Sequence, residues 1–219
     1  MKKITTIIIL ALFVMSAFAQ SERRELGEAN SLRISVPFKV LLVKGTANKV
    51  EIIGLDAQYL SNVKTEINGG ELSIYTKGKI KSKNEVVLSL TYKHFDRIKV
   101  GGAAELKSLD LIRQKELEII GSGAIEADLN IEVTNLSIVF SGASDLKLRG
   151  LADSLYLKTS GASDVKASNF VSKNIYVDVS GASDVKVNAI ESIQGEATGA
   201  SSVNVKGSPA IKAINKTRL

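Results

Sequence analysis

The stretch SGASDLKLRGLADSLYLKTSGASDVKASNFVSKNIYVDVSGASDVKV, residues 141–187, has the clearest periodic pattern in the chain. Within it the motif SGASD occurs three times, at 141–145, 160–164 and 180–184. Apolar residues alternate with polar residues before and after each copy, as at Leu155 and Leu157 and again at Val165 and Ala167. Alternation with a period of two is typical of strands that bury one face. The stretch therefore predicts β-strands.

Looser copies of the Gly-Ala pair extend this pattern in both directions along the chain. The glycines of the six pairs are Gly102, Gly123, Gly142, Gly161, Gly181 and Gly199, at intervals of 21, 19, 19, 20 and 18 residues. Two short strands in each near-constant period predict a parallel β-helix, whose stacked turns would lie about 4.8 Å apart. The consensus of leucine-rich repeats and the nine-residue period of calcium-binding rolls are both absent. Glycine suits the bend in each turn, because it adopts backbone angles closed to other residues.

Serines that follow the Gly-Ala pairs occupy equivalent positions of the predicted turns. They are Ser144, Ser163, Ser183 and Ser201. We expect them to form one column that points inward, with hydroxyl groups that hydrogen-bond along the stack.

Residues 31–100 alternate like strands but show no clear period. Turn signals divide them at 44–46, 68–70 and 77–79. We interpret this half as the first, irregular turns of the β-helix or as a small sheet that caps it, since an open end would expose strand edges. The predicted organisation has five parts: signal peptide 1–19, linker 20–30, irregular β region 31–100, periodic turns 101–207 and C-terminal tail 208–219.

The first nineteen residues have the three regions of a secretory signal peptide. Lys2 and Lys3 precede an apolar run at 7–14, and Ala17-Phe18-Ala19 provides a cleavage site before Gln20. A membrane anchor is the alternative, but the apolar run is short and polar residues follow it directly. No later segment reaches spanning length. The sequence predicts export to the periplasm or the cell surface.

Composition excludes several classes of site. The chain has no cysteine, which excludes disulfides, thiolate metal sites and cysteine nucleophiles, and one histidine, which excludes a zinc site of several imidazoles. The formal charge of +6 falls to +4 without Lys2 and Lys3, and the basic residues form no cluster. This is a weak argument for nucleic acid as a partner. We expect no cofactor.

The periodic half, together with ISVPFKVLLVKG at 34–45 and INGGELSIYTKG at 67–78, resembles the GIN-domain family. This family is described as the head domain of putative auto-transporter adhesins, was earlier a domain of unknown function, and is common in Bacteroidetes. The resemblance covers about residues 31–207. It implies a right-handed, single-stranded parallel β-helix and a cell-envelope or secreted location, and it brings no functional residues.

The sharpest candidate site is a column of acidic residues. Asp145, Asp164 and Asp184 would stack, with Glu105 and Glu126 continuing the column. Stacked carboxylates could share a hard cation such as calcium, which takes six or more oxygen ligands. A lysine lies two residues after each aspartate, however, and alternating charges would neutralise the column without an ion. The second interpretation is favoured, so no metal is expected.

Tyr156 and Tyr176 are the second candidate site, because they would project outward from adjacent turns and stack. An exposed tyrosine pair is a platform for sugar rings, and the simpler alternative is a cross-strand pair that stabilises the sheet. His94 and Asp96 could in principle form a general base and its orienting group. Nothing in the sequence supplies a nucleophile or pocket for them, so a surface histidine is favoured.

Three functions remain open at this point. The first is a non-enzymatic, adhesin-like module that binds extended glycan or protein partners through a flat outer face. The second is a polysaccharide-acting enzyme, which needs convergent carboxylates that the sequence does not show. The third is a structural scaffold that assembles through its strand edges. The first is predicted, and the oligomeric state is not.

Overall fold

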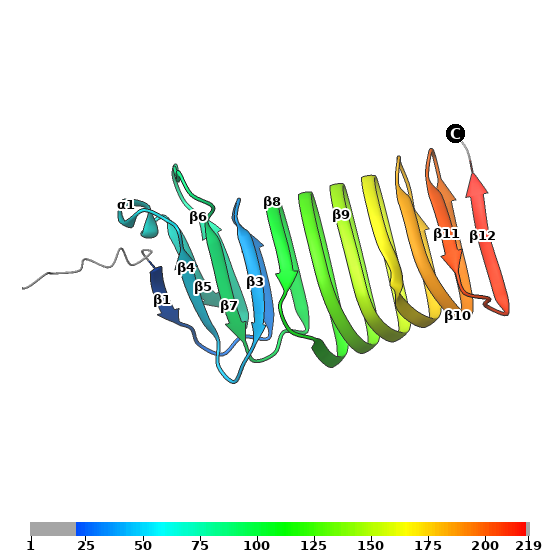
Figure 1. Ribbon diagram of the computed structural model, residues 1–219, viewed down its shortest axis with the longest axis horizontal. Coiled ribbons are helices and arrows are strands. Elements are labelled where there is room, and N and C mark those ends of the chain that lie inside the picture. The colour runs from blue at the N-terminus through cyan, green and yellow to red at the C-terminus, as the bar shows by residue number, and fades with distance from the viewer. Residues whose placement is uncertain (1–20, 218–219) are drawn as a thin grey trace, which may run out of the picture.

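The computed structural model describes residues 21–217 and shows an all-β protein, as the alternating pattern predicts (Figure 1). The predicted signal peptide, residues 1–19, lies outside the described residues. In chain order the elements are β1 (Ser21–Glu25), β2 (Ser31–Ser35), β3 (Lys39–Lys44), β4 (Lys49–Ile53), α1 (Ala57–Leu60), β5 (Val63–Asn68), β6 (Glu71–Thr76), β7 (Val87–Tyr92), β8 (Arg97–Ser108), β9 (Ile112–Val179), β10 (Asp184–Thr198), β11 (Ser202–Lys206) and β12 (Ile211–Thr217).

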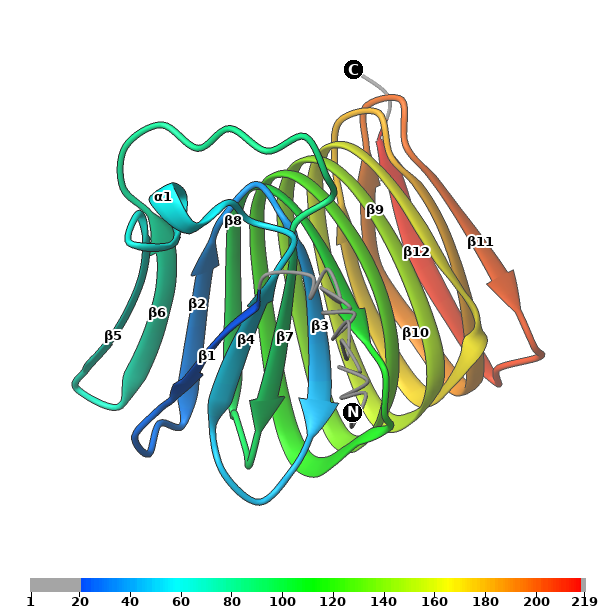
Figure 2. The same cartoon turned by 60° about the vertical axis from the view of Figure 1, so that its left-hand side comes forward.

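The strands form one mixed sheet that curls around the core as an open half-barrel (Figures 1 and 2). Its first part has the order β1-β4-β7-β3-β8-β2-β6-β5, in which the pairs β1–β4, β4–β7 and β5–β6 are antiparallel. The right-handed, single-stranded parallel β-helix, with residues 31–100 as its first turns or cap, is therefore a wrong prediction. Short connections are the physical reason. Only Gly69 and Gly70 join β5 to β6, and a two-residue connection makes its two strands antiparallel.

From β8 to β12 the pairings between elements are parallel. The long element β9 bends repeatedly, so successive stretches of the chain lie side by side and run in the same direction (Figure 1). We call each stretch between two bends a pass. The register places Asp184 between Asp164 and Ser202, and Tyr176 beside Gln194. Side chains that are far apart in the sequence are thereby brought into rows across neighbouring passes.

The glycines of the Gly-Ala pairs lie where neighbouring passes touch. Gly161 has a φ of 99°, and a Cβ atom built there would lie 2.4 Å from the carbonyl oxygen of Gly142. Gly142 has a φ of 104° and meets Gly123 in the same way, at 2.5 Å. Both the backbone angle and the close approach require glycine. The exposed dipeptide Gly161-Ala162 also interrupts the burial alternation of its pass.

The core consists of the inward residues of every strand, and Leu157 and Val177 are fully buried in it. Ser144, Ser163 and Ser183 are buried as well, so these three serines do point inward. They do not bond to one another as we expect from the sequence. Ser183 Oγ donates to the carbonyl of Ser180 at 3.2 Å, whereas the hydroxyls of Ser144 and Ser163 have no hydrogen-bond partner among residues 21–217. The small size of serine, rather than a hydroxyl ladder, accounts for the column.

Side chains close the N-terminal end of the sheet. Arg24 extends from β1, donates from Nη1 to the carbonyl of Val63 at 2.6 Å and from Nη2 to the carbonyl of Leu60 at 3.0 Å. Asn48 is buried, donates to the carbonyl of Gly27 at 2.9 Å and accepts from the backbone N–H of Lys93 at 3.0 Å. The Arg24 bonds join β1 to a segment with which it does not pair, and the Asn48 bonds hold together the chain at the ends of β1, β4 and β7, which do pair.

Candidate functional site

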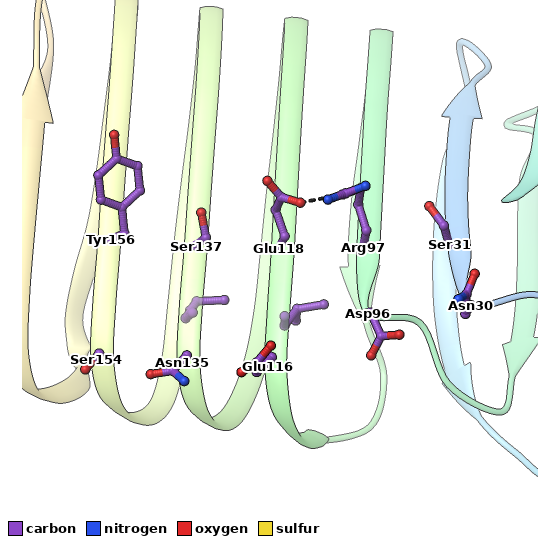
Figure 3. Close-up of a pocket in the computed structure, with 12 residues that line it drawn as sticks. Asn30, Ser31, Asp96, Arg97, Glu116, Glu118, Asn135, Ser137, Ser154 and Tyr156 are labelled. Atoms are coloured by element: carbon purple, nitrogen blue, oxygen red, sulfur yellow. Dashed lines mark hydrogen bonds and ion pairs between the residues drawn. The ribbon is translucent and has the colours of Figure 1, made fainter. Parts of the chain in front are cut away.

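A groove of about 570 Å³ crosses the outer face of the sheet from β2 over β8 to three successive passes of β9 (Figure 3). Two rows of polar side chains line it. The first row is Ser31, Arg97, Glu118, Ser137 and Tyr156, and the second row is Asn30, Asp96, Glu116, Asn135 and Ser154. We refer to these residues, with Leu117 and Leu136 between the rows, as the groove.

The rows follow from strand alternation and from the parallel register. Ser31 pairs with Arg97, and Arg97 pairs with Glu118, so the first row runs straight across the strands. Leu117 and Leu136 separate the rows and are buried, because they occupy the inward positions of the same passes. With strands about 4.8 Å apart, five positions span about 19 Å. The groove is therefore long and shallow, a shape suited to an extended ligand.

The charges in the groove are partly compensated. Arg97 donates to Glu118, and the two form an ion pair in the middle of the first row (Figure 3). His94 Nε2 lies 2.7 Å from Asp96 Oδ1, with both side chains about half exposed. Glu116 takes part in no ion pair among residues 21–217. The groove thus offers carboxylates, hydroxyls, two amides and a guanidinium to a ligand.

Tyr156 closes one end of the groove, and Tyr176 continues beyond it on the next pass. Their rings are stacked, with centroids 5.6 Å apart and planes inclined by 6°, and the residues are 38% and 46% exposed. Beside them, Lys158 Nζ bonds to Asp178 Oδ2 at 2.5 Å, and this hydrogen bond raises the pKa of Lys158. The structure therefore brings the two tyrosines together as the sequence predicts and places them next to a groove. We call this pair the tyrosine platform.

The acidic column lies outside the groove, on the other side of the Gly-Ala pairs in the sequence. Asp164 pairs with Lys166 at 2.8 Å, and Asp184 pairs with Lys186 at 2.9 Å. Hydrogen bonds from Ser202 and then from Lys186 lower the pKa of Asp184. Asp145 lines a small cavity of about 200 Å³ with Lys147 and Lys166. Between residues 21 and 217 there is no group of three or more His, Cys, Asp or Glu side chains that could hold a metal ion.

His94 lies at the edge of the candidate site. It borders a separate cavity with Lys93 and Gly70, and only its partner Asp96 lines the groove. His94 and Asp96 do interact, as the sequence allows. The hydroxyl groups in the two rows of the groove belong to serines and a tyrosine on an open surface. The geometry gives this pair no nucleophile to activate.

Sequence reasoning missed the two polar rows. Their signal is nevertheless present, because counting back from Tyr156 by the intervals of the Gly-Ala pairs gives Ser137, Glu118 and Arg97 in turn. The continuation to Ser31 could not be found in this way. It depends on the pairing of β2 with β8, which joins the aperiodic half to the periodic one.

Solved structures with the same fold come from species of Bacteroides and Parabacteroides. One is described as a putative adhesin from Bacteroides fragilis, with a TM-score of 0.82 and 19% identity over 91% of this chain and 94% of that chain. A second is described as a putative lipid binding protein from Parabacteroides distasonis, with a TM-score of 0.69, 17% identity and the same shares covered. A third, a putative adhesin from Parabacteroides merdae, has a TM-score of 0.60 and 13% identity over the same shares. At these identities the likeness shows the fold alone.

No curated protein matches the chain. Within residues 21–217, none of the helical structure has the length and hydropathy needed to cross a bilayer. The model of one family, described as "Putative auto-transporter adhesin, head GIN domain", matches residues 30–209. The match confirms the resemblance seen in the sequence and points to a protein of the cell envelope or one that is exported. The chain belongs to the GIN-domain family of auto-transporter-type adhesin heads.

Proposed function

We propose that this protein is a non-enzymatic, exported module of the cell envelope that binds an extended glycan along the groove and on the tyrosine platform. The observation that carries the proposal is the position of the stacked pair Tyr156–Tyr176 at the end of a groove lined by two rows of hydrogen-bonding groups. The C–H face of a sugar ring packs on an aromatic face, while its hydroxyls pair with polar side chains. The family name, an adhesin head, agrees with a binding function.

The shape of the site supports a polymer rather than a small molecule. The groove is open along its length, and a ligand about 19 Å long would contact five successive strands at once. Several weak contacts would then add to a useful affinity. A small ligand would instead favour an enclosed cavity with few, convergent polar groups.

The arrangement of the acids supports binding rather than catalysis. Glycoside hydrolysis needs two free carboxyl groups on opposite sides of the scissile bond. In the groove Glu118 is paired with Arg97 and Asp96 with His94, which leaves Glu116 as the free acid among the groove residues. Release of reducing ends from a bound polysaccharide would contradict the proposal.

Affinity electrophoresis in gels that contain mannan, dextran, xylan or hyaluronate tests the proposal. We expect retardation by at least one of these polymers, and the double variant Tyr156→Ala/Tyr176→Ala should weaken it about tenfold or more. Tyr75→Ala removes an outward tyrosine of β6 that does not line the groove, and it serves as the matched control. Equal weakening by the control and the double variant would contradict the assignment.

The acidic column enters the same experiment as a second arm. Substitution of Asp145, Asp164 and Asp184 by Asn should leave retardation unchanged, because these carboxylates lie outside the groove and two of them already bind lysines. Loss of retardation in this triple variant alone would move the binding site from the groove to the acidic column.

A further inference from the structure

The loop between β6 and β7 carries an isolated concentration of positive charge. It arches over the strand ends beside α1 (Figure 2). Lysines occupy alternate positions, 77, 79, 81 and 83, and all four are exposed. Gly78, Ile80 and Ser82 lie between them.

The residues between the lysines hold the loop against the body of the protein. Ile80 is half-buried and packs against the core. Ser82 Oγ donates to the carbonyl of Gly54 at 3.1 Å. Asn62 Nδ2 donates to the carbonyl of Lys79 at 3.0 Å, and the N–H of Lys77 donates to the carbonyl of Asn62 at 2.8 Å. The loop is thus anchored from inside, and its lysines are directed to solvent.

These four lysines are close together in the sequence and have no paired carboxylate among residues 21–217. None of the four takes part in an ion pair within the described part of the chain, whereas Lys39, Lys99, Lys158 and Lys166 do. Two acids lie close by in the sequence or structure. Glu85 is already paired with Lys39 at 3.4 Å, and Asp56 precedes α1. The four positive charges of the loop therefore lie together with few carboxylates near them.

We propose that this lysine loop docks the protein onto the surface of an anionic lipid bilayer. Four or more clustered basic residues on a projecting segment are attracted by a layer of acidic headgroups. Alternate residues of an extended segment lie about 7 Å apart, so four lysines at this spacing can reach several headgroups at once. The loop projects outward, which suits a surface rather than a single enclosed phosphate. It contains no aromatic residue on which a nucleic-acid base could stack.

Docking through this loop would leave the groove accessible. The loop follows the C-terminal end of β6, whereas the groove lies beside the N-terminal end of that strand, where the N–H of Asn30 donates to the carbonyl of Gly70 at 3.0 Å. The proposal does not depend on the glycan proposal. The variant Tyr156→Ala/Tyr176→Ala should bind vesicles as the unchanged protein does.

Co-sedimentation with vesicles tests the inference. We expect the protein to bind vesicles of phosphatidylglycerol and phosphatidylethanolamine, and to bind vesicles of phosphatidylcholine far more weakly. The triple variant Lys79→Gln/Lys81→Gln/Lys83→Gln should lose about a hundredfold in affinity. The matched control Lys206→Gln/Lys212→Gln/Lys216→Gln removes the same charge from exposed positions at the other end and should change the affinity by less than about threefold. Melting temperatures establish that each variant is folded.

Three results would overturn the inference. The first is no binding of the unchanged protein to the anionic vesicles. The second is equal binding by the loop variant and the control. The third is displacement from vesicles by millimolar glycerol 3-phosphate, which would identify a site for a single phosphate instead of a bilayer surface.

Discussion

Residues 97–206 and residues 21–92 belong to one sheet, yet they build it in different ways. In the later region the pairings between elements are parallel, and like residues lie side by side, as Asp164 does with Asp184. In the earlier region the antiparallel pairs β1–β4, β4–β7 and β5–β6 lie in the same sheet as the parallel pairs β3–β7 and β2–β6. The two regions are stabilised in different ways. Both regions bury an apolar core; the later region adds the close fit of stacked glycines, and the earlier region adds individual side-chain hydrogen bonds.

The largest effect should come from an inward position of the later region. We expect Val177→Asp to lower the free energy of unfolding by about 4 kcal/mol, because a carboxylate would enter the apolar core without a partner. Tyr156→Ala, on the outward side of a neighbouring pass, should cost about 1 kcal/mol through the lost ring contact with Tyr176. Urea unfolding of both variants measures the difference. Equal losses would mean that these residues do not face opposite sides.

A pair of glycine substitutions compares the two regions directly. Gly161→Ala should destabilise by about 3 kcal/mol, because its Cβ would overlap the backbone of Gly142 as well as strain the positive φ. Gly69→Ala, in the β5–β6 turn, also has a positive φ but meets no atom within 4 Å. Gly69→Ala should lower the free energy of unfolding by about 1 kcal/mol. Similar melting temperatures for the two variants would show that the passes can separate at Gly161 without penalty.

A comparison of two arginines tests the role of individual bonds in the earlier region. Arg24→Ala leaves the carbonyls of Val63 and Leu60 without their donor and should cost about 2 kcal/mol. Arg113 forms an ion pair with Glu132 at 2.7 Å on the outer face of the later region, and its side chain is 69% exposed. Arg113→Ala should therefore leave the melting temperature nearly unchanged. A larger loss at Arg113 than at Arg24 would reverse the distinction drawn between the regions.

The smallest effect is a dependence on acid. Hydrogen bonds from Lys99 and then from Arg33 lower the pKa of Glu71. Because its folded-state pKa lies below the unfolded value, ionised Glu71 stabilises the protein at neutral pH, and this stabilisation is lost as the pH falls below about 4.5 and through the folded-state pKa. The loss of melting temperature between about pH 7 and pH 3 should be smaller in Glu71→Gln.

Asp184→Asn gives the corresponding measurement in the later region, since its pKa is also lowered, chiefly by the hydrogen bond from Ser202. If Glu71→Gln lost as much melting temperature between neutral and acid pH as the unchanged protein, Lys99 and Arg33 would not lower the pKa of Glu71 in solution.

The site could be predicted only in part. Tyr156 and Tyr176 are found from their equal positions relative to the Gly-Ala pairs, and their ring stacking follows from the parallel register. The rest of the groove escapes prediction, because Asn30 and Ser31 reach it through strand pairing across more than sixty residues of intervening chain, as Ser31 with Arg97 shows. Hydrophobic periodicity identifies a buried face but carries no information about which strand lies next to which.

The amino-acid pattern alone predicts the all-β character, the inward and outward sides of the periodic half, and the bends that need glycine. These are local properties, since alternation and backbone angles depend on a few neighbouring residues. Tertiary structure alone decided that the earlier strands run antiparallel, that Arg24 bridges β1 to the chain around β5, and that the tyrosine platform adjoins a groove. Strand order and direction depend on contacts between residues that are distant in the sequence. The free energies of these contacts cannot be judged from any single stretch of the chain.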